Sequence, residues 1–409
     1  MEAMGVNELV PGCVEIIPSR LLWLPLKNKR VPPDTERMHF FSIDKVFVYE
    51  PFFKDFGPPN LAHTYRYCRL LDCKFKDPNV QGKVIVHCCS QSYKKLANAA
   101  FFIGAYLVIV LRQSAERAFE RFSCVARSFV PYRDASALND NVFPLTVFDC
   151  LKGIEDSMSR GFFDSERFNV ESYDFFSRVE NGDANWVLPD RLLAFAGPCS
   201  KPVDEDGYPA FTPDDYVPIF LDAGIRLVIR LNRSSYDKKR FTEKGIKHAD
   251  FYFPDGTCPP GKIIDRFLYV VESEEGPCAV HCKAGLGRTG TLIALFAMKH
   301  FRFSARSFIG WSRICRPGSI LGPQQQFLVD MEANMFQEGM LMMPPQNLPS
   351  AFTSGTHNLV AQIGRLGIRD LTEKEKTEDV GQAERLCHAK RSQIVVTNAI
   401  TQGMAPGYE

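Results

Sequence analysis

The feature that most constrains this chain is a seven-residue loop, CKAGLGR, that begins at Cys282 and ends at Arg288. The residues Ala279–His281 before the loop predict a strand, and the apolar stretch Thr289–Phe301 after it predicts a buried helix. Backbone N–H groups of such a loop converge with the positive end of the helix on one point. The arrangement therefore predicts a receptor for a tetrahedral dianion.

Several residues of the loop suit phosphoryl chemistry. Gly285 and Gly287 let the backbone turn its N–H groups inward, and the planar fork of Arg288 binds two phosphoryl oxygens at once. The same positive field favours the thiolate of Cys282, which is the nucleophilic form of a cysteine. The nucleophile and the anion receptor then lie in one loop, and the sequence predicts a cysteine-dependent phosphatase.

Other interpretations fit this loop less well. Gly285–Gly290 also spells the dinucleotide-binding pattern GxGxxG, but that pattern needs an acidic residue about 20 positions further on. No Asp or Glu occurs between Gly290 and Asp330. A Walker loop needs a lysine where Arg288 stands. The remaining alternative is a buried cysteine that lies by chance near a surface arginine.

Asp255 is the candidate general acid, because expelling a serine alkoxide requires a proton donor. The residues Phe251–Phe253 predict the end of a strand, and Asp255 follows in the Pro/Gly-rich loop Pro254–Pro260. A mobile loop could close and deliver the carboxyl group to the site. An Asp-Gly pair is also ordinary turn chemistry, so the assignment depends on Cys282 downstream.

These residues predict a two-step reaction without a metal or other cofactor. Cys282 takes the phosphoryl group while Asp255 protonates the departing oxygen, and Asp255 then activates the water that hydrolyses the phosphocysteine. Thr289 donates its hydroxyl to the sulfur as the sulfur leaves. The phosphoryl oxygens are held by the loop residues, which are Lys283, Ala284, Gly285, Leu286, Gly287 and Arg288.

Composition places the chain among soluble globular proteins with no predicted nucleic-acid or membrane partner. It has 409 residues, 45% hydrophobic and 24% charged, with a net charge of +1, which gives no case for nucleic acid. No N-terminal signal sequence stands out, and the longest apolar run, Leu96–Leu111, is too short to span a bilayer. The 13 scattered cysteines suit a reducing compartment, and none has a second ligand pair at zinc spacing.

Several segments together resemble one known family. They are His281–Thr291 (HCKAGLGRTGT), Arg313–Ser319, Gly322–Phe327, Phe41–Asp44, Asp55–Pro58, Asn60–Ala62 and Glu180–Asp183. The chain resembles the mitotic-exit dual-specificity phosphatases of the cell division cycle protein fourteen family over roughly residues 12 to 345. The resemblance implies an α/β protein with two tandem phosphatase-like domains, each a central sheet flanked by helices, joined by a linker helix.

The resemblance also sets expectations about domains, substrates and location. We expect a catalytically degenerate domain at 1–165, an acidic linker helix at 166–183 and a catalytic domain at 184–337. The implied substrates are phosphorylated proteins with phosphoserine followed by proline and a basic residue downstream, as in cyclin-dependent kinase sites. Phosphothreonine and phosphotyrosine are included. The implied location is the nucleus and cytoplasm, with the centrosome, spindle or basal body as candidate sites, and the oligomeric state stays open.

The N-terminal half contains a degraded copy of the catalytic unit. Lys83–Cys88 again predicts a strand that ends in His-Cys, and Leu96–Leu111 predicts the helix that follows. Lys94 stands where the arginine belongs, and a lysine is a point charge without the bidentate fork. The loop between Cys88 and Lys94 contains no glycine. Cys88 is therefore interpreted as a scaffold cysteine.

The predicted linker is acidic: residues 164–183 contain six Asp or Glu residues against two arginines. Such a run is usually a solvated helix face. In the family, acids of this linker bind the basic residues of the substrate, and the resemblance assigns that role to Asp174 and Asp183. Ser177 stands where a third acid is expected.

The C-terminal residues 338–409 change in composition and predict a flexible tail, with a short helix allowed within its charged stretch Leu371–Arg391.

Two other functions compete with an active protein phosphatase. A phosphoprotein-binding pseudo-phosphatase is disfavoured because Cys282, Arg288 and Asp255 are all present. A lipid phosphatase would need more basic residues in the loop than Lys283 alone.

Overall fold

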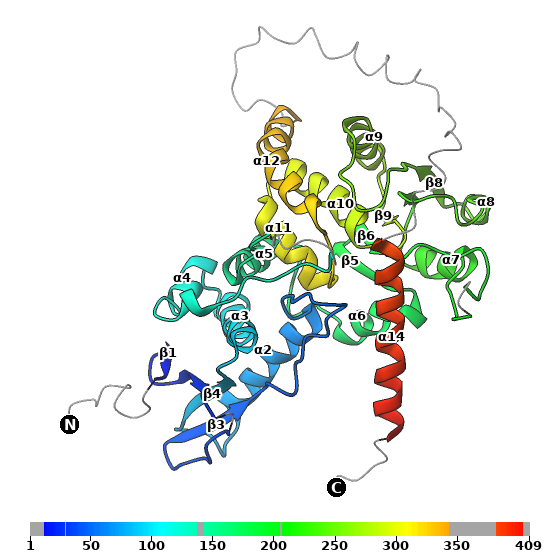
Figure 1. Ribbon diagram of the computed structural model, residues 1–409. Helices are drawn as coiled ribbons and strands as arrows, with labels where there is room; N and C mark the ends of the chain where they lie inside the picture. The colour runs from blue at the N-terminus through cyan, green and yellow to red at the C-terminus, as the bar shows by residue number, and fades with distance from the viewer. Residues whose placement is uncertain (1–11, 29, 137–142, 205–206, 343–381, 404–409) are drawn as a thin grey trace, which may run out of the picture.

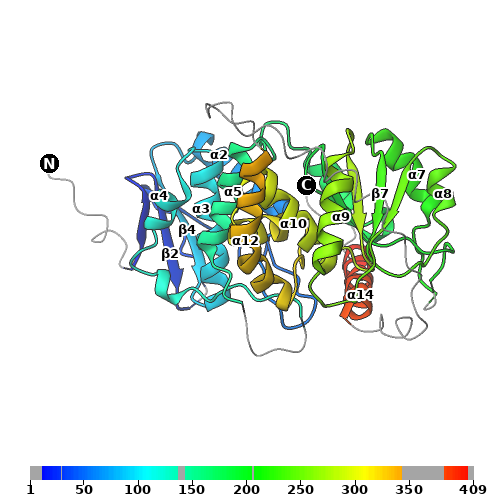
Figure 2. The same cartoon turned by 90° about the horizontal axis from the view of Figure 1, so that it is seen from above.

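The computed structural model describes residues 12–28, 30–136, 143–204, 207–342 and 382–403, with side chains in the last stretch as far as Ser392. Two β-sheets lie toward opposite ends of the molecule (Figures 1 and 2). The helices α5, α10 and α12 stand between the two sheets (Figure 2). The predicted α/β class, with sheets flanked by helices, is confirmed.

The first sheet has four strands in the order β1-β2-β4-β3. β1 and β2 are antiparallel, whereas β4 is parallel to both of its neighbours. The helix predicted at Leu96–Leu111 begins three residues earlier, at Tyr93, and ends two residues earlier, at Ile109. The elements of this half are β1 Val14–Ile17, β2 Leu21–Leu26, β3 Met38–Ser42, α2 Leu61–Lys76, β4 Val84–Ser90, α3 Tyr93–Ile109, α4 Ala115–Glu120, the 3₁₀ turn Ala126–Ser128 and α5 Val147–Ser159.

The second sheet has five strands in the order β5-β6-β9-β7-β8. β5 and β6 are antiparallel, and the other pairs are parallel. The elements from the linker onward are α6 Val170–Ser177, the 3₁₀ turn Val179–Asn181, β5 Ala184–Leu188, β6 Leu192–Phe195, α7 Pro213–Asp222, β7 Leu227–Arg230, α8 Lys239–Thr242, β8 Lys247–Asp250, α9 Gly261–Glu272, β9 Cys278–His281, α10 Gly287–Phe301, α11 Ala305–Cys315, α12 Pro323–Met342 and α14 Gln382–Gly403.

The two sheets repeat one topology around a central strand that carries a histidine with a cysteine directly after it. His87 on β4 lies between Trp23 and Phe41 of the neighbouring strands. His281 on β9 lies in the same way between Phe195 and Arg230. The histidine and the cysteine after it therefore occupy equivalent positions in the two halves.

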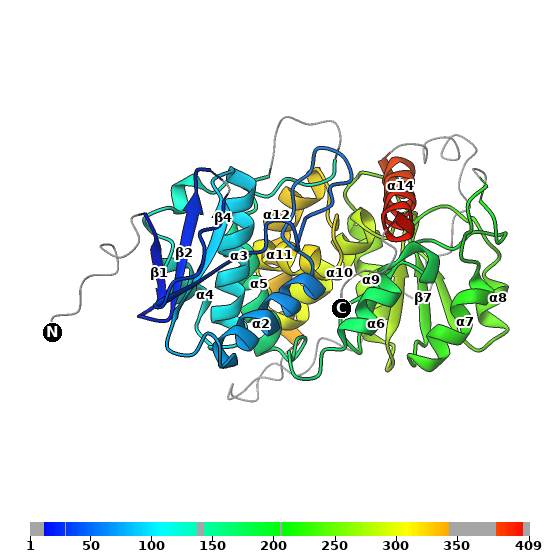
Figure 3. The ribbon, with the colours of Figure 1, turned by 90° about the horizontal axis from the view of Figure 1, so that it is seen from below.

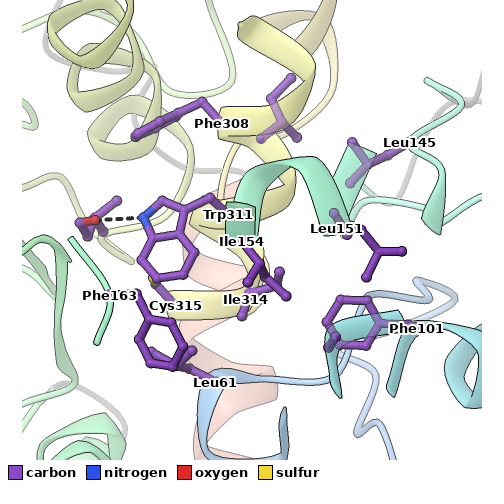
Figure 4. Close-up of a cluster of buried hydrophobic side chains, with 14 of the residues drawn as sticks. Leu61, Phe101, Leu145, Leu151, Ile154, Phe163, Phe308, Trp311, Ile314 and Cys315 are labelled. Atoms are coloured by element: carbon purple, nitrogen blue, oxygen red, sulfur yellow. Dashed lines mark hydrogen bonds between the residues drawn. The ribbon is translucent and has the colours of Figure 1, made fainter. Parts of the chain in front are cut away.

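The two halves share one hydrophobic core, which is centred on α5 and α11 (Figure 4). A Cβ atom on Gly153 of α5 would lie 2.4 Å from the carbonyl oxygen of Ser307 on α11. A Cβ atom on Gly310 would lie 2.9 Å from the Cα of Cys150. The two glycines thus let the helix backbones approach closely, and Trp311 fills the adjoining space while donating to the Val187 carbonyl at 2.9 Å.

Two predicted boundaries of secondary-structure elements are wrong. Phe251–Phe253 is not a strand end, because β8 already stops at Asp250. The linker helix is shorter than 166–183: Asn169 caps its first turn and the helix ends at Ser177. α12 continues to Met342, and the domain end at residue 337 stays a prediction. The sequence allowed a short helix within Leu371–Arg391, and the structure has a longer helix at Gln382–Gly403. Residues 343–381 and 404–409 of the predicted tail lie outside the described residues.

No helix in the described part of the chain is long and apolar enough to cross a lipid bilayer.

Candidate active site

The predicted anion-binding loop lies between β9 and α10, as expected. Cys282 follows the last strand residue directly, and Gly287 begins the helix. Gly285 has φ of +66°, and a Cβ atom there would lie 2.0 Å from the Phe195 carbonyl oxygen. Because both the conformation and the close contact exclude a side chain, only glycine fits this position. The loop backbone is therefore held against the end of β6.

Arg288 and Asp255 are brought together although 33 residues separate them. The Arg288 side chain is fully buried, and its Nη1 donates to the Phe253 carbonyl at 3.0 Å. Its Nη2 lies 3.2 Å from Oδ1 of Asp255. The loop that carries the predicted acid is thus bound to the arginine of the predicted phosphate site, through a hydrogen bond and an ion pair.

Thr289 is the fourth predicted catalytic residue, in the first turn of α10. Its Oγ1 is buried and has no hydrogen-bond partner among the described residues. A buried hydroxyl without a partner carries a desolvation cost, which a ligand or a nearby sulfur atom could offset. Its predicted role as a donor to the Cys282 sulfur stays a prediction.

A buried network beneath the loop orients Cys282, and sequence reasoning missed it. Nδ1 of His281 donates to the Cys282 carbonyl at 2.8 Å, so Nε2 must accept from the Tyr236 hydroxyl at 2.7 Å. The Tyr236 hydroxyl in turn accepts from Nε2 of His248 at 2.9 Å. Burial lowers the pKa of His281 to about 3, which keeps the ring neutral, and the bond to the Cys282 carbonyl fixes its tautomer.

Arg316 joins the loop to the end of the linker and was also missed. Its fully buried guanidinium donates to the carbonyls of Gly285 at 2.7 Å and Ala284 at 3.1 Å. It also contacts Asp183 Oδ1 and Asn185 Oδ1, both at 2.8 Å. Arg316 lay within a segment that matched the family, but its partners are distant in sequence, so only the fold identifies this role.

The two linker acids predicted to bind the basic residue of the substrate, Asp174 and Asp183, have different surroundings. Asp183 is 5% exposed beside Arg316, and the turn through Gly182, at φ +108°, directs it there. Asp174 forms an ion pair with Arg66 on α2 of the N-terminal half. Asp183 is therefore close to the loop, whereas Asp174 pairs with a residue of the other half. Ser177, where a third acid was expected, accepts from the Asn185 amide at 2.7 Å.

The copy in the N-terminal half does not form a comparable loop. β4 continues to Ser90 and α3 begins at Tyr93, so Cys88 lies inside the sheet, paired with Leu24 and Ser42. Its side chain is buried, and burial raises its pKa to about 12. This environment disfavours a thiolate and supports the interpretation of Cys88 as a scaffold cysteine.

Among the described residues, no group of three or more His, Cys, Asp or Glu side chains is arranged so that it could hold a metal ion. The site therefore consists of a cysteine at the end of a strand, a loop at a helix N-terminus, an arginine and a carboxyl group.

Comparison with known proteins identifies two matching families. The family described as "Dual specificity protein phosphatase, N-terminal half" matches residues 15–157, and "Polymorphic toxin system, DSP-PTPase phosphatase" matches residues 208–301. Among solved structures, "Crystal structure of Tk-PTP in the active form" aligns at 20% identity with a TM-score of 0.31. That alignment covers 37% of this chain and 96% of the other.

The curated relatives align with most of the chain. Dual specificity protein phosphatase CDC14A of Mus musculus is 43% identical over 400 residues, which are 97% of this chain and 65% of the relative. CDC14C of Homo sapiens is 44% identical over 308 residues, 75% of this chain and 69% of the relative. Tyrosine-protein phosphatase CDC14 of Saccharomyces cerevisiae is 35% identical over 343 residues, which are 81% of this chain and 61% of the relative. The chain thus spans about two thirds of the length of these relatives.

Proposed function

We propose that this chain, which belongs to the CDC14 family of dual specificity protein phosphatases, hydrolyses phosphate monoesters of proteins through a phosphocysteine. The observation that carries the proposal is the contact of Arg288 with Asp255 beside the loop of Cys282. A pairing of phosphate receptor, nucleophile and proton donor is what the expulsion of a serine alkoxide requires.

In the proposed first step, the Cys282 sulfur attacks phosphorus in line with the leaving oxygen. Inward-facing loop amides, the N-terminus of α10 and the guanidinium of Arg288 stabilise the charge on the equatorial oxygens. Asp255 gives its proton to the leaving oxygen. Arg288 stands beside the Asp255 carboxyl group, so substrate binding draws the arginine toward the phosphoryl oxygens and frees the acid.

In the proposed second step, Asp255 takes a proton from water as the water attacks the phosphocysteine. The hydroxyl of Thr289 donates to the sulfur as the bond breaks, which offsets the charge on the leaving thiolate. His281 remains neutral throughout and keeps the Cys282 backbone in place.

We further propose that the substrates carry phosphoserine followed by proline with a basic residue downstream, and that Asp183 binds that basic residue. The support is the position of Asp183 at the edge of the loop, where it is held by Arg316. We also propose a role in cell-cycle control in the nucleus and cytoplasm. This last proposal rests on family resemblance alone, and imaging of the tagged protein would test it.

The test of the chemistry is Cys282→Ser, with Cys88→Ser as the matched control in the equivalent position of the other half. Cys282→Ser should abolish turnover of a phosphoserine peptide while peptide binding stays measurable, because the amides and Arg288 remain. Cys88→Ser should keep near-normal kinetics. Near-normal turnover by pure Cys282→Ser protein would show that no phosphocysteine forms.

A further inference from the structure

The C-terminal helix α14 lies against the face of the molecule that carries the candidate active site, beside the second sheet (Figures 1 and 3). Its residues at helical spacing point into that face, and Leu386 is 1% exposed. Ala383 and Leu386 form one apolar cluster with Ala284 and Leu286 of the phosphate-binding loop. The helix therefore packs directly on the loop that follows the nucleophile.

The first turn of α14 engages the predicted general acid. The backbone N–H of Ala383 donates to Oδ2 of Asp255 at 2.8 Å. The first N–H groups of a helix lack intrahelical partners, and an aspartate side chain at the helix N-terminus can accept from them. Asp255 thus caps α14, and its Oδ2 is occupied by this contact.

The next residue of α14 reaches the loop itself. Oε1 of Glu384 lies 3.0 Å from Nζ of Lys283, directly after the nucleophile. The carboxylate of Glu384 thereby pairs with the side chain directly after Cys282. α14 thus contacts both the loop residue directly after the nucleophile and the predicted general acid.

Two turns further on, α14 presents a Lys-Arg pair to acids of the same face. Nζ of Lys390 lies 2.8 and 2.7 Å from the two carboxylate oxygens of Asp183. Arg391 forms an ion pair with Asp204. Burial and Arg316 lower the pKa of Lys390, and Asp183 opposes that shift. Without Asp183, the ammonium group of Lys390 would be buried with no compensating charge, which is destabilising. The ion pair therefore stabilises this position of the helix.

We infer that α14 is an intramolecular ligand of the phosphatase site and competes with phosphoprotein for it. The inference rests on the proposed function, because it assigns to α14 the acid, the loop lysine and the linker acid that a basic phosphopeptide would use. Asp183 and Asp204 then form one acidic surface that accepts consecutive basic residues. The apparent kcat/KM equals that of the uncovered site multiplied by the uncovered fraction.

The test uses the full chain with substitutions on α14. Leu386→Asp removes the apolar anchor, and Lys390→Glu places a carboxylate against Asp183. His388→Asp is the matched control, because His388 is exposed on the same helix. Loss of a fully buried leucine should raise kcat/KM for a phosphoserine peptide by about 10-fold or more. The readouts are turnover of the peptide and of para-nitrophenyl phosphate, and the rate of Cys282 alkylation by iodoacetamide followed by mass spectrometry.

The outcomes separate this inference from the proposed function. Faster turnover and faster alkylation in Leu386→Asp and Lys390→Glu, but not in His388→Asp, support it. Unchanged or slower rates in both variants overturn it while the activity of the wild type stands. If wild type and variants all lack turnover, the proposed function fails and the competition with it, whatever the alkylation rates. If Leu386→Asp disturbs folding, Lys390→Glu decides.

Discussion

Replacing Arg316 by lysine tests whether the loop is held in its catalytic shape from outside. The guanidinium donates to two loop carbonyls, those of Gly285 and Ala284, and at the same time faces Asp183 and Asn185. A lysine keeps the positive charge near Asp183, but it has three donors on one nitrogen and cannot span both sets of acceptors.

The expected magnitude follows from the bonds that are lost. A hydrogen bond from a charged donor contributes about 1.5–3 kcal/mol, so losing both loop contacts costs ~3–6 kcal/mol before any relaxation. If the ammonium recovers one of the contacts, the free energy of unfolding should fall by about 1.5–3 kcal/mol. A loop displaced by a fraction of an ångström should also lower kcat, by about 10- to 100-fold.

The assay is kcat on para-nitrophenyl phosphate together with urea unfolding, with Arg313→Lys as the matched control. Arg313 is a buried arginine in the last turn of α11, and its guanidinium donates to the Ser319 and Ile320 carbonyls and to Gln325. We expect both variants to lose stability but only Arg316→Lys to lose kcat in large measure. An equal fall in kcat for the two variants, in proportion to stability, would refute a specific role for Arg316.

Two further predictions concern the acid and the substrate. Asp255→Asn should lower kcat on a phosphoserine peptide by about 10²–10⁴-fold but much less on an aryl phosphate, whose leaving group needs no proton; equal losses would indicate a structural role for Asp255. Phosphopeptides with a downstream lysine should be preferred over alanine versions by a few-fold, and 0.5 M salt should shrink that preference in kcat/KM if Asp183 provides it; a salt-independent preference would point to apolar contacts instead.

The catalytic loop could be predicted from the sequence because its signals are local. The strand before Cys282, the glycines and the helix after Arg288 are contiguous, and Asp255 stands in a recognisable turn. The linker was predicted too long, because an acidic stretch shows neither the Asn169 cap nor the end of the helix at Ser177. Acidic composition alone also could not show that Asp174 pairs with Arg66.

The parts that sequence reasoning missed depend on contacts between distant segments. Arg316 binds the carbonyls of Gly285 and Ala284, which precede it by 31 and 32 residues. It also binds Asp183, which precedes it by 133 residues. The sequence allowed a short helix within Leu371–Arg391 of a flexible tail, but it could not show that this helix packs on the loop after Cys282. Its burial comes from packing of Leu386 and Ala383 on a loop a hundred residues earlier. Tertiary contact, rather than intrinsic propensity, stabilises such a helix.

The degraded N-terminal half supports the catalytic loop through one helix, α11. On one side the α11 backbone packs on α5 at Gly153 and Gly310, and on the other Trp311 donates to the Val187 carbonyl of β5. The same helix ends at Cys315, and Arg316 directly after it holds the loop. A shift of α5 would move α11 and with it the donors to the loop carbonyls. The N-terminal half can therefore lose its own catalytic loop and still be required for the geometry of the loop around Cys282.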